Sequence, residues 1–186
     1  MLGPTQKAWL RERLKGSTAT FKFVVSPASI SQAWVFPYDS WEGYGAERTE
    51  LLNFIRAEGI ANVIFLVTDL HMNLINEVFV DKFTDQFLGL PAVAHKVITG
   101  PIASLTQQNN ILRDFGPSLG PTILALRHAL LDLAGASCRH LNVFSYGSVA
   151  VDATAGTAII ALKDGTGQVI HDQLNPAIAC TKTLGP

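Results

Sequence analysis

Charge and long apolar runs are both scarce in this sequence of 186 residues. Only 16% of the residues are charged, and 14 basic and 15 acidic side chains give a formal net charge of −1. No basic cluster is present that would attract nucleic acid or another polyanion. No apolar run reaches the roughly 18 to 20 residues of a membrane helix, and the opening MLGPTQKAWLRERLKG is too polar for a secretory signal. We therefore expect a soluble protein with neither a signal peptide nor a transmembrane segment.

Cysteine is also scarce, since Cys138 and Cys180 are the only two. Two cysteines do not make a disulfide framework, and these two could pair, stay free or be buried as thiols. The P-loop and the patterns G-x-G-x-x-G, H-E-x-x-H and C-x-x-C are missing from the sequence. The sequence therefore lacks the local patterns typical of nucleotide- and dinucleotide-binding proteins.

The composition that remains is apolar, with 48% hydrophobic residues and a mean hydropathy of +0.25, which argues against disorder. The length suits one domain with a hydrophobic core but not two. We see no internal repeat, low-complexity tract or linker. The sequence predicts a single domain over residues 1–186.

Helical spacing appears in four segments. The first helix is expected from Pro4 to about Leu14, and two more over residues 46–60 and 120–135. Residues 73–83, NLINEVFVDKF, have a weaker helical pattern. Each of these segments needs an apolar surface to pack against.

Strands are predicted over residues 20–25 and 62–67, and again over 141–153 and 156–170, where Asp164 begins a turn. The first two strands, with the helix between them, make a βαβ unit. The strand over 62–67 is apolar on both faces, as expected of a central strand with helices on both sides. The fold class is therefore α/β.

The strand NVIFLVTDLH ends on Asp69 and His71, which are two residues apart. If the chain stays extended there, both side chains point the same way. Ligands of open α/β sheets bind outside the carboxyl ends of the strands, and a carboxylate with an imidazole suits a divalent or trivalent metal ion. The alternative is a capping Asp69 with a His71 that makes only a core hydrogen bond.

A second group of candidates lies in DSWEGYGAER, in a loop rich in proline, glycine and tryptophan. Asp39, Trp41 and Tyr44 would belong to the rim of the Asp69 and His71 site, or the segment is a loop in which Trp41 packs as a lid on the core, and the two interpretations are compatible. Asn73 is close enough in sequence to orient His71 as a supporting residue that does not itself bind the metal ion. The remaining histidines, His95, His128, His140 and His171, are expected to be surface or core side chains.

The order of these segments resembles the C-terminal part of PhoD-like alkaline phosphatases and phosphodiesterases, in the metallophosphoesterase superfamily. The first helix looks like the family's LG..Q..WL...L pattern, and FKFVV is similar to its WKV strand. DSWEGYGAER looks like its D-x-W-[DE]-G-Y…R segment, and NVIFLVTDLH like its NVV.L.GD.H strand and metal loop. TGPIAS and NVFSYGSVAVD are similar to later parts of the family. The resemblance extends from residue 1 to about residue 160.

The resemblance implies a partial metallophosphoesterase-like sheet sandwich with flanking helices and C-terminal β-hairpin strands. It implies a phosphatase or phosphodiesterase in which Asp69 and His71 are catalytic metal ligands and Asp39, Trp41 and Tyr44 bind substrate. The cofactors would be divalent or trivalent metal ions, namely calcium, iron, zinc or manganese, which act as Lewis acids on a phosphoester.

The alternative is a truncated or degenerate relative that has no activity and serves as a binding or assembly module. The family's earlier metal motifs lie upstream of the matched region, and Thr68 stands where the family usually has glycine. A partial sandwich also leaves a sheet face and edge to be covered. We therefore expect a homodimer or a partner chain that supplies the missing elements.

Overall fold

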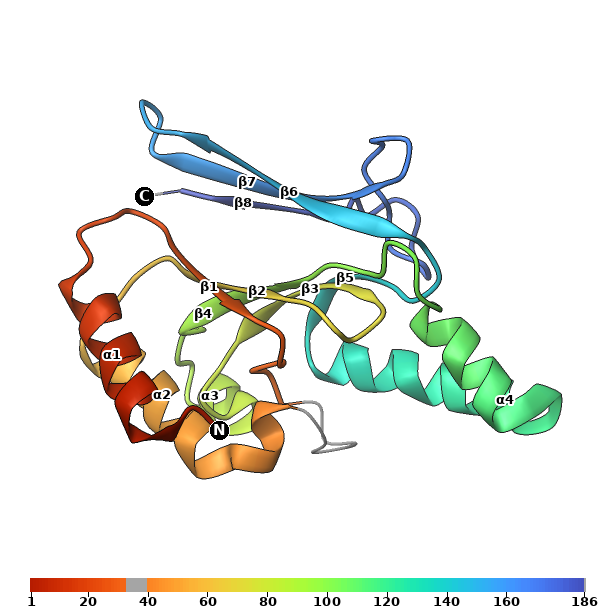
Figure 1. The fold of residues 1–186 in the computed structure, drawn as a ribbon, viewed down its shortest axis with the longest axis horizontal. Helices are drawn as coiled ribbons and strands as arrows, with labels where there is room; N and C mark the ends of the chain where they lie inside the picture. Colours follow the sequence, from red (N-terminus) through yellow and green to blue (C-terminus); the bar gives the residue numbers. More distant parts are fainter. Residues whose placement is uncertain (33–39, 186) are drawn as a thin grey trace.

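Two β-sheets face each other, and the helices cover the outer face of the larger sheet (Figure 1). The structure is a computed structural model that describes residues 1–32 and 40–185. In this part of the chain no helix combines the length and the hydropathy needed to cross a membrane. The fold is thus a three-layer arrangement of helices, large sheet and small sheet.

The large sheet has the strand order β1-β2-β4-β3-β5. Its strands are β1 (Lys22–Ser26), β2 (Val63–Val67), β3 (Asn73–Val78), β4 (Ala94–Ile98) and β5 (Ala136–His140). β1, β2 and β4 are parallel, whereas β3 is antiparallel to β4 and β5. The carboxyl ends of β2 and β4 therefore lie at the same edge of the sheet.

The small sheet is an antiparallel meander with the order β6-β7-β8. It consists of β6 (Ser145–Asp152), β7 (Thr157–Asp164) and β8 (Thr181–Leu184). β6 and β7 form the predicted hairpin, and the chain turns after Asp164 as expected. Its inner face packs on the large sheet.

The helices are α1 (Gly3–Gly16), the short 3₁₀ helix η1 (Trp41–Tyr44), α2 (Gly45–Ala57), α3 (Lys82–Phe87) and α4 (Gln107–Leu133). The helix predicted over 120–135 is thus the second half of α4. Gly116 has a positive φ of 67° inside α4, so the helix is kinked there.

The alternation of side chains in β2 explains why this strand is apolar on both faces. Val63, Phe65 and Val67 pack into the core beneath the helices, and Ile64 packs into a second core against the small sheet. The prediction of helices on both sides of β2 was wrong, because the small sheet covers one face. An apolar strand indicates burial on both faces but not the kind of element that buries it.

The predicted βαβ unit is confirmed by the parallel pairing of β1 with β2 across α2. The helix predicted over 73–83 was wrong, because its first part is strand β3. β3 lies between β4 and β5, and five of its six residues are buried. A strand buried on both faces loses the alternation that distinguishes it from a helix.

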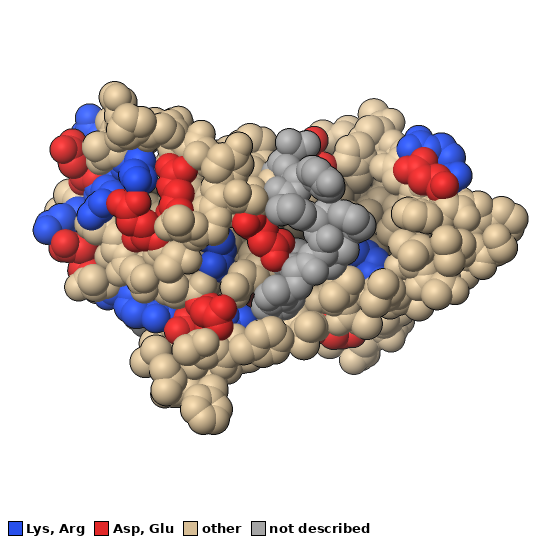
Figure 2. Space-filling model, turned by 90° about the horizontal axis from the view of Figure 1, so that it is seen from below, with Lys and Arg blue, Asp and Glu red and all other residues tan. Residues whose placement is uncertain are grey.

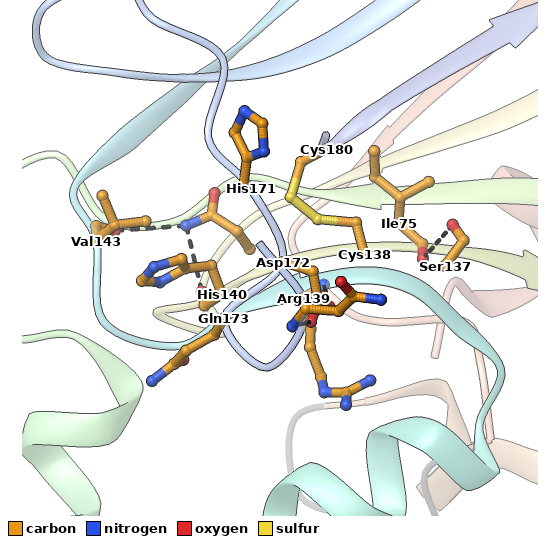
Figure 3. The surroundings of a disulfide bond; sticks show 12 residues. Ile75, Ser137, Cys138, Arg139, His140, Val143, His171, Asp172, Gln173 and Cys180 are labelled. Atoms are coloured by element: carbon orange, nitrogen blue, oxygen red, sulfur yellow. Dashed lines mark hydrogen bonds between the residues drawn. A yellow bond between two sulfur atoms is a disulfide. The ribbon is translucent and has the colours of Figure 1, made fainter. Parts of the chain in front are cut away.

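Cys138 and Cys180 pair as a disulfide, with their Cα atoms 5.3 Å apart (Figure 3). The bond joins β5 of the large sheet to the residue before β8 of the small sheet. Next to it, the backbone nitrogen of Arg139 donates to the Asp172 carboxylate at 2.8 Å. The two sheets are thus held together covalently at one end of the second core.

Candidate functional site

A pocket of about 280 Å³ opens at the edge where β2 and β4 end and β6 begins. Asp69 and His71 both line it, so the structure brings the two predicted residues to one site. The other lining residues are Thr68, Thr99, Gly100, Pro101, Ile102, Ser104, Ser145, Tyr146 and Gly147. A site at the carboxyl ends of adjacent parallel strands is where open α/β sheets bind their ligands.

The backbone turns sharply between β2 and β3 and does not stay extended. Asp69 has a φ of 67° and His71 a φ of 54°, both in the left-handed region. Leu70 donates its backbone N–H to the Thr68 carbonyl at 2.9 Å, which closes a three-residue turn at Asp69. Such conformations cost on the order of 1 to 3 kcal/mol per residue and gather at functional sites.

Leu105 fixes the ring of His71. The Nδ1 atom of His71 lies 2.6 Å from the Leu105 carbonyl oxygen and 3.3 Å from Ser104 Oγ. Since a carbonyl only accepts, Nδ1 carries the proton and donates to it. Nε2 then has its lone pair available, as in histidines that bind a metal ion.

Gln107 holds the same turn from the start of α4. Its backbone nitrogen donates to the His71 carbonyl at 2.7 Å, and its side-chain Nε2 donates to the Leu70 carbonyl at 3.2 Å. The Oε1 atom accepts from Arg127 Nε at 3.0 Å. The turn is therefore restrained by α4 as well as by its own hydrogen bond.

Asn73 supports the pocket wall and has its hydrogen bonds there. It is fully buried, and its Oδ1 accepts from the Gly100 backbone nitrogen at 2.9 Å and from the Ser145 hydroxyl. Its Nδ2 lies 3.4 Å from the carbonyl oxygens of His140 and Val143. The described contacts of Asn73 thus fix Gly100 and Ser145, whereas those of the His71 ring are with Leu105 and Ser104.

Two of the three predicted substrate-binding residues, Trp41 and Tyr44, do not line this pocket. Trp41 is 3% exposed and belongs to the core beneath the helices, and its backbone nitrogen donates to the Ser29 carbonyl at 3.0 Å. Tyr44 is exposed at the end of η1. Neither is among the described residues that line the pocket. Asp39 lies outside the described residues.

Two donors of the metal-binding type, Asp69 and His71, are present at the pocket. Within residues 1–32 and 40–185, no three His, Cys, Asp or Glu residues are grouped closely enough to hold a metal ion together. A carboxylate oxygen and an imidazole with a free Nε2 fit such an ion as part of a coordination shell. They provide two of the four to six ligands that metals take in proteins.

Sequence reasoning missed Thr99, Ser145 and Tyr146 as pocket residues. Strand β4, over residues 94–98, was not predicted, so the residues after it were not placed beside Asp69. The signal was available in TGPIAS, a polar turn sequence that directly follows the apolar Val97 and Ile98. A second strand end at the same sheet edge would have pointed to these residues.

A serine-hydrolase pattern, G-x-S-x-G, is present at residues 116–120 as GPSLG. Catalytic serines of this pattern sit on a sharp turn from a strand to a helix. Here the pattern lies at the kink inside α4, and Ser118 is exposed there. The pattern therefore carries no catalytic assignment.

Comparisons with known proteins agree with this architecture. A family model described as PhoD-like phosphatase matches residues 1–158. Alkaline phosphatase D of Bacillus subtilis (strain 168) is 28% identical over 109 residues, which are 54% of this chain and 19% of that protein. The solved structure of PhoD matches 97% of this chain and 32% of its own, at 18% identity and a TM-score of 0.63.

The structural match confirms the expected metallophosphoesterase-like sandwich as the fold. The chain spans 19% of the length of the curated relative and 32% of the solved structure, so it corresponds to a part of each. The family model matches most of the chain, from its first residue to within β7. The chain therefore belongs to the PhoD-like phosphatase family.

Proposed function

We propose that this chain is part of a metal-dependent phosphoester hydrolase in which Asp69 and His71 are metal ligands. The observation that carries the proposal is their convergence on one pocket, with the Nδ1 of His71 bonded to the Leu105 carbonyl and its Nε2 left for a ligand. Membership of the PhoD-like phosphatase family supports the same chemistry.

The residues of this chain would bind and orient the reacting groups. Asp69 would contribute a carboxylate oxygen and His71 an imidazole nitrogen, and hydrogen bonds restrain the backbone turn that carries both residues. When bound, calcium, iron, zinc or manganese would act as a Lewis acid on the phosphoester oxygens. Thr99 and Tyr146 also line the pocket, and their hydroxyl groups can donate hydrogen bonds to phosphate oxygens.

Substrate contacts by Asp39, Trp41 and Tyr44 are proposed from the family motif alone. Trp41 would act through its packing, because its side chain is buried. Asn73 would position the pocket wall through Gly100 and Ser145, rather than the His71 ring directly.

The test is metal content together with turnover. Purified chain, Asp69→Ala and His71→Ala would be compared by elemental analysis and by hydrolysis of a chromogenic phosphomonoester and phosphodiester. We expect bound metal and turnover in the parent chain and at least a hundredfold lower turnover in both variants. Asp114→Ala and His171→Ala serve as matched controls, since both residues are exposed and neither lines the pocket. Equal metal content in parent and Asp69→Ala would contradict the assignment.

A second candidate function is a non-catalytic binding or assembly module. It is favoured by the presence of only two grouped metal-type donors in the described part of the chain. It predicts that neither metal nor turnover is found, while the chain remains folded.

We also propose that a second copy or a partner chain covers the edge strands β1 and β6. Val25 on β1 is 77% exposed, and Val149 and Val151 on β6 are also exposed. Exposed apolar side chains on edge strands favour pairing with another chain. Analytical ultracentrifugation at micromolar concentration should give a dimer, and a monodisperse monomer would count against this proposal.

A further inference from the structure

A second cavity, distinct from the Asp69 and His71 pocket, lies between the large sheet and α4. It has a volume of about 440 Å³, within the range of about 300 to 1,000 Å³ that small-molecule sites occupy. Its walls are mostly apolar, and Leu74, Ile111, Phe115 and Leu126 are among them. Leu70 faces this cavity while its neighbours Asp69 and His71 face the other one.

Two cationic side chains, Lys96 and Arg127, line this apolar cavity. Lys96 projects from the middle of β4, is 3% exposed, and donates to Ser29 Oγ at 3.0 Å. Arg127 projects from α4 and donates to Gln107 Oε1 at 3.0 Å, and its Nη2 lies 3.8 Å from the sulfur of Met72. All the described hydrogen-bond partners of these two side chains are uncharged. Buried cations normally have an anionic partner.

Among the charged residues that the structure describes around this cavity, the positive charges exceed the negative ones by one when Lys96 is protonated. Glu42 also lines the cavity and offsets one of the two cations. Arg48 lies near Lys96, but Asp81 lies close to Arg48 and offsets it, and the nearby Asp85 is paired with Arg56. Desolvation by burial lowers the pKa of Lys96 to about 7, so an anion beside it would also favour its protonated form.

The outer surface beside the cavity is apolar as well. Figure 2 shows the helix-covered face, with charged side chains gathered over α1 to α3 and few over α4. Phe115, Leu119, Leu126 and Leu133 of α4 are all exposed. An apolar tail that leaves the cavity along α4 would remain in contact with apolar side chains.

We propose that this cavity binds a long-chain carboxylate, with its head group on Lys96 and Arg127 and its tail against the apolar wall. A monoanion neutralises the surplus charge. A phosphate monoester, with a charge of roughly −1.5 to −2, would leave net negative charge near Glu42 in an apolar setting, which is unfavourable. The guanidinium of Arg127 can bind a carboxylate through two parallel N–H groups.

The test is calorimetric titration of the full chain with dodecanoate. We expect binding, with at least tenfold weaker affinity in both Lys96→Met and Arg127→Met. Arg113→Met is the matched control, because Arg113 is an exposed arginine on the same helix, paired with Asp114. Circular dichroism of each variant checks that it is folded, and Leu126→Asp provides a second, tail-side variant that should also bind at least tenfold more weakly.

Three other probes separate the contribution of the charged head group from that of the apolar tail. Dodecanol has the tail without the charge and acetate the charge without the tail, and both should bind at least tenfold more weakly than dodecanoate. Equal binding of dodecanol would overturn the role of the cations, and unchanged affinity in Arg127→Met would do the same. Tighter binding of dodecyl phosphate would overturn the carboxylate as occupant. None of these outcomes depends on metal content or phosphoester turnover.

Discussion

The Oδ1 atom of Asn73 lies 2.9 Å from the backbone nitrogen of Gly100, although the two residues are 27 positions apart in sequence. The contact joins the start of β3 to the turn after β4 and leaves little space. A Cβ atom on Gly100 would lie 2.6 Å from Asn73 Nδ2. This contact sets the position of one wall of the candidate site.

Replacing Asn73 should destabilise the protein. In Asn73→Ala, the Ser145 hydroxyl loses its acceptor and the buried Gly100 N–H keeps only Ser145 Oγ, at 3.1 Å, so we expect the free energy of unfolding to fall by about 2 kcal/mol. Urea denaturation measures the change. Asn109→Ala, at an exposed position near the start of α4, is the control and should change stability by less than about 0.5 kcal/mol.

The strained turn predicts an unusual order of stabilities at Asp69. Because its φ is 67°, glycine should be tolerated better than alanine, and Asp69→Ala should be about 1 kcal/mol less stable than Asp69→Gly. Chemical denaturation of the two variants gives the difference. At Glu12, an exposed position within α1, the order should reverse, since glycine is the poorer helix former. The same order at both positions would contradict the turn geometry.

Gln107 is expected to influence the proposed metal site without contacting the metal. Gln107→Ala removes the side-chain hydrogen bond to the Leu70 carbonyl, and loss of such a supporting contact typically weakens metal affinity about 10- to 100-fold. Titration with Mn²⁺ measures the affinity, and a thermal melt without metal checks that the fold is retained. Gln108→Ala is the matched control, since Gln108 accepts from Gln173 and does not contact the turn. Equal affinities in the two variants would remove Gln107 from this role.

Lys96 should make stability depend on pH in the alkaline range. Its pKa is lowered by desolvation from 10.5 to about 7, so between these values the unfolded chain binds a proton that the folded chain does not. Stability should therefore rise from pH 7 towards 10.5, by up to about 1.4 kcal/mol per pH unit from this group.

The control for this dependence is Lys96→Met, which has a similar side-chain length and no charge. This variant should be more stable than the parent chain at pH 7, and the difference should shrink as the pH approaches 10.5. Urea denaturation at a series of pH values gives both curves. Parallel curves would show that Lys96 is not the titrating group.

Much of this arrangement follows from sequence patterns, and the exceptions have physical causes. The helix at residues 46–60 and the hairpin of β6 and β7 were predicted because one face of each meets the core, which leaves a clear period. β3 and β4 were missed for two reasons. Both their faces are buried, so the strands lack an alternation of apolar and polar residues, and buried polar residues such as Asn76 and Lys96 interrupt the apolar runs.

The site was predicted in part for a related reason. Asp69 and His71 end a recognisable strand, and their types alone suggest a metal ion. Ser145 and Gly100 come to the same pocket from distant segments, through the pairing of β4 and the contact with Asn73. Both of these interactions join residues far apart in the sequence, so no local pattern predicts them. Trp41 shows a different case, since the sequence allowed it either at the rim of the site or packed on the core, and its side chain is buried in the core.

The bond between Cys138 and Cys180 also closes a covalent ring that contains β6, β7 and the hairpin tip at residues 153–156. The tip is a turn whose first residues are exposed, the kind of place where proteases first cut a folded chain. A single cut there opens the ring without separating the pieces. The nicked chain would migrate as two fragments on a reducing gel and as one species without reductant, so limited proteolysis reads out the pairing of the cysteines directly.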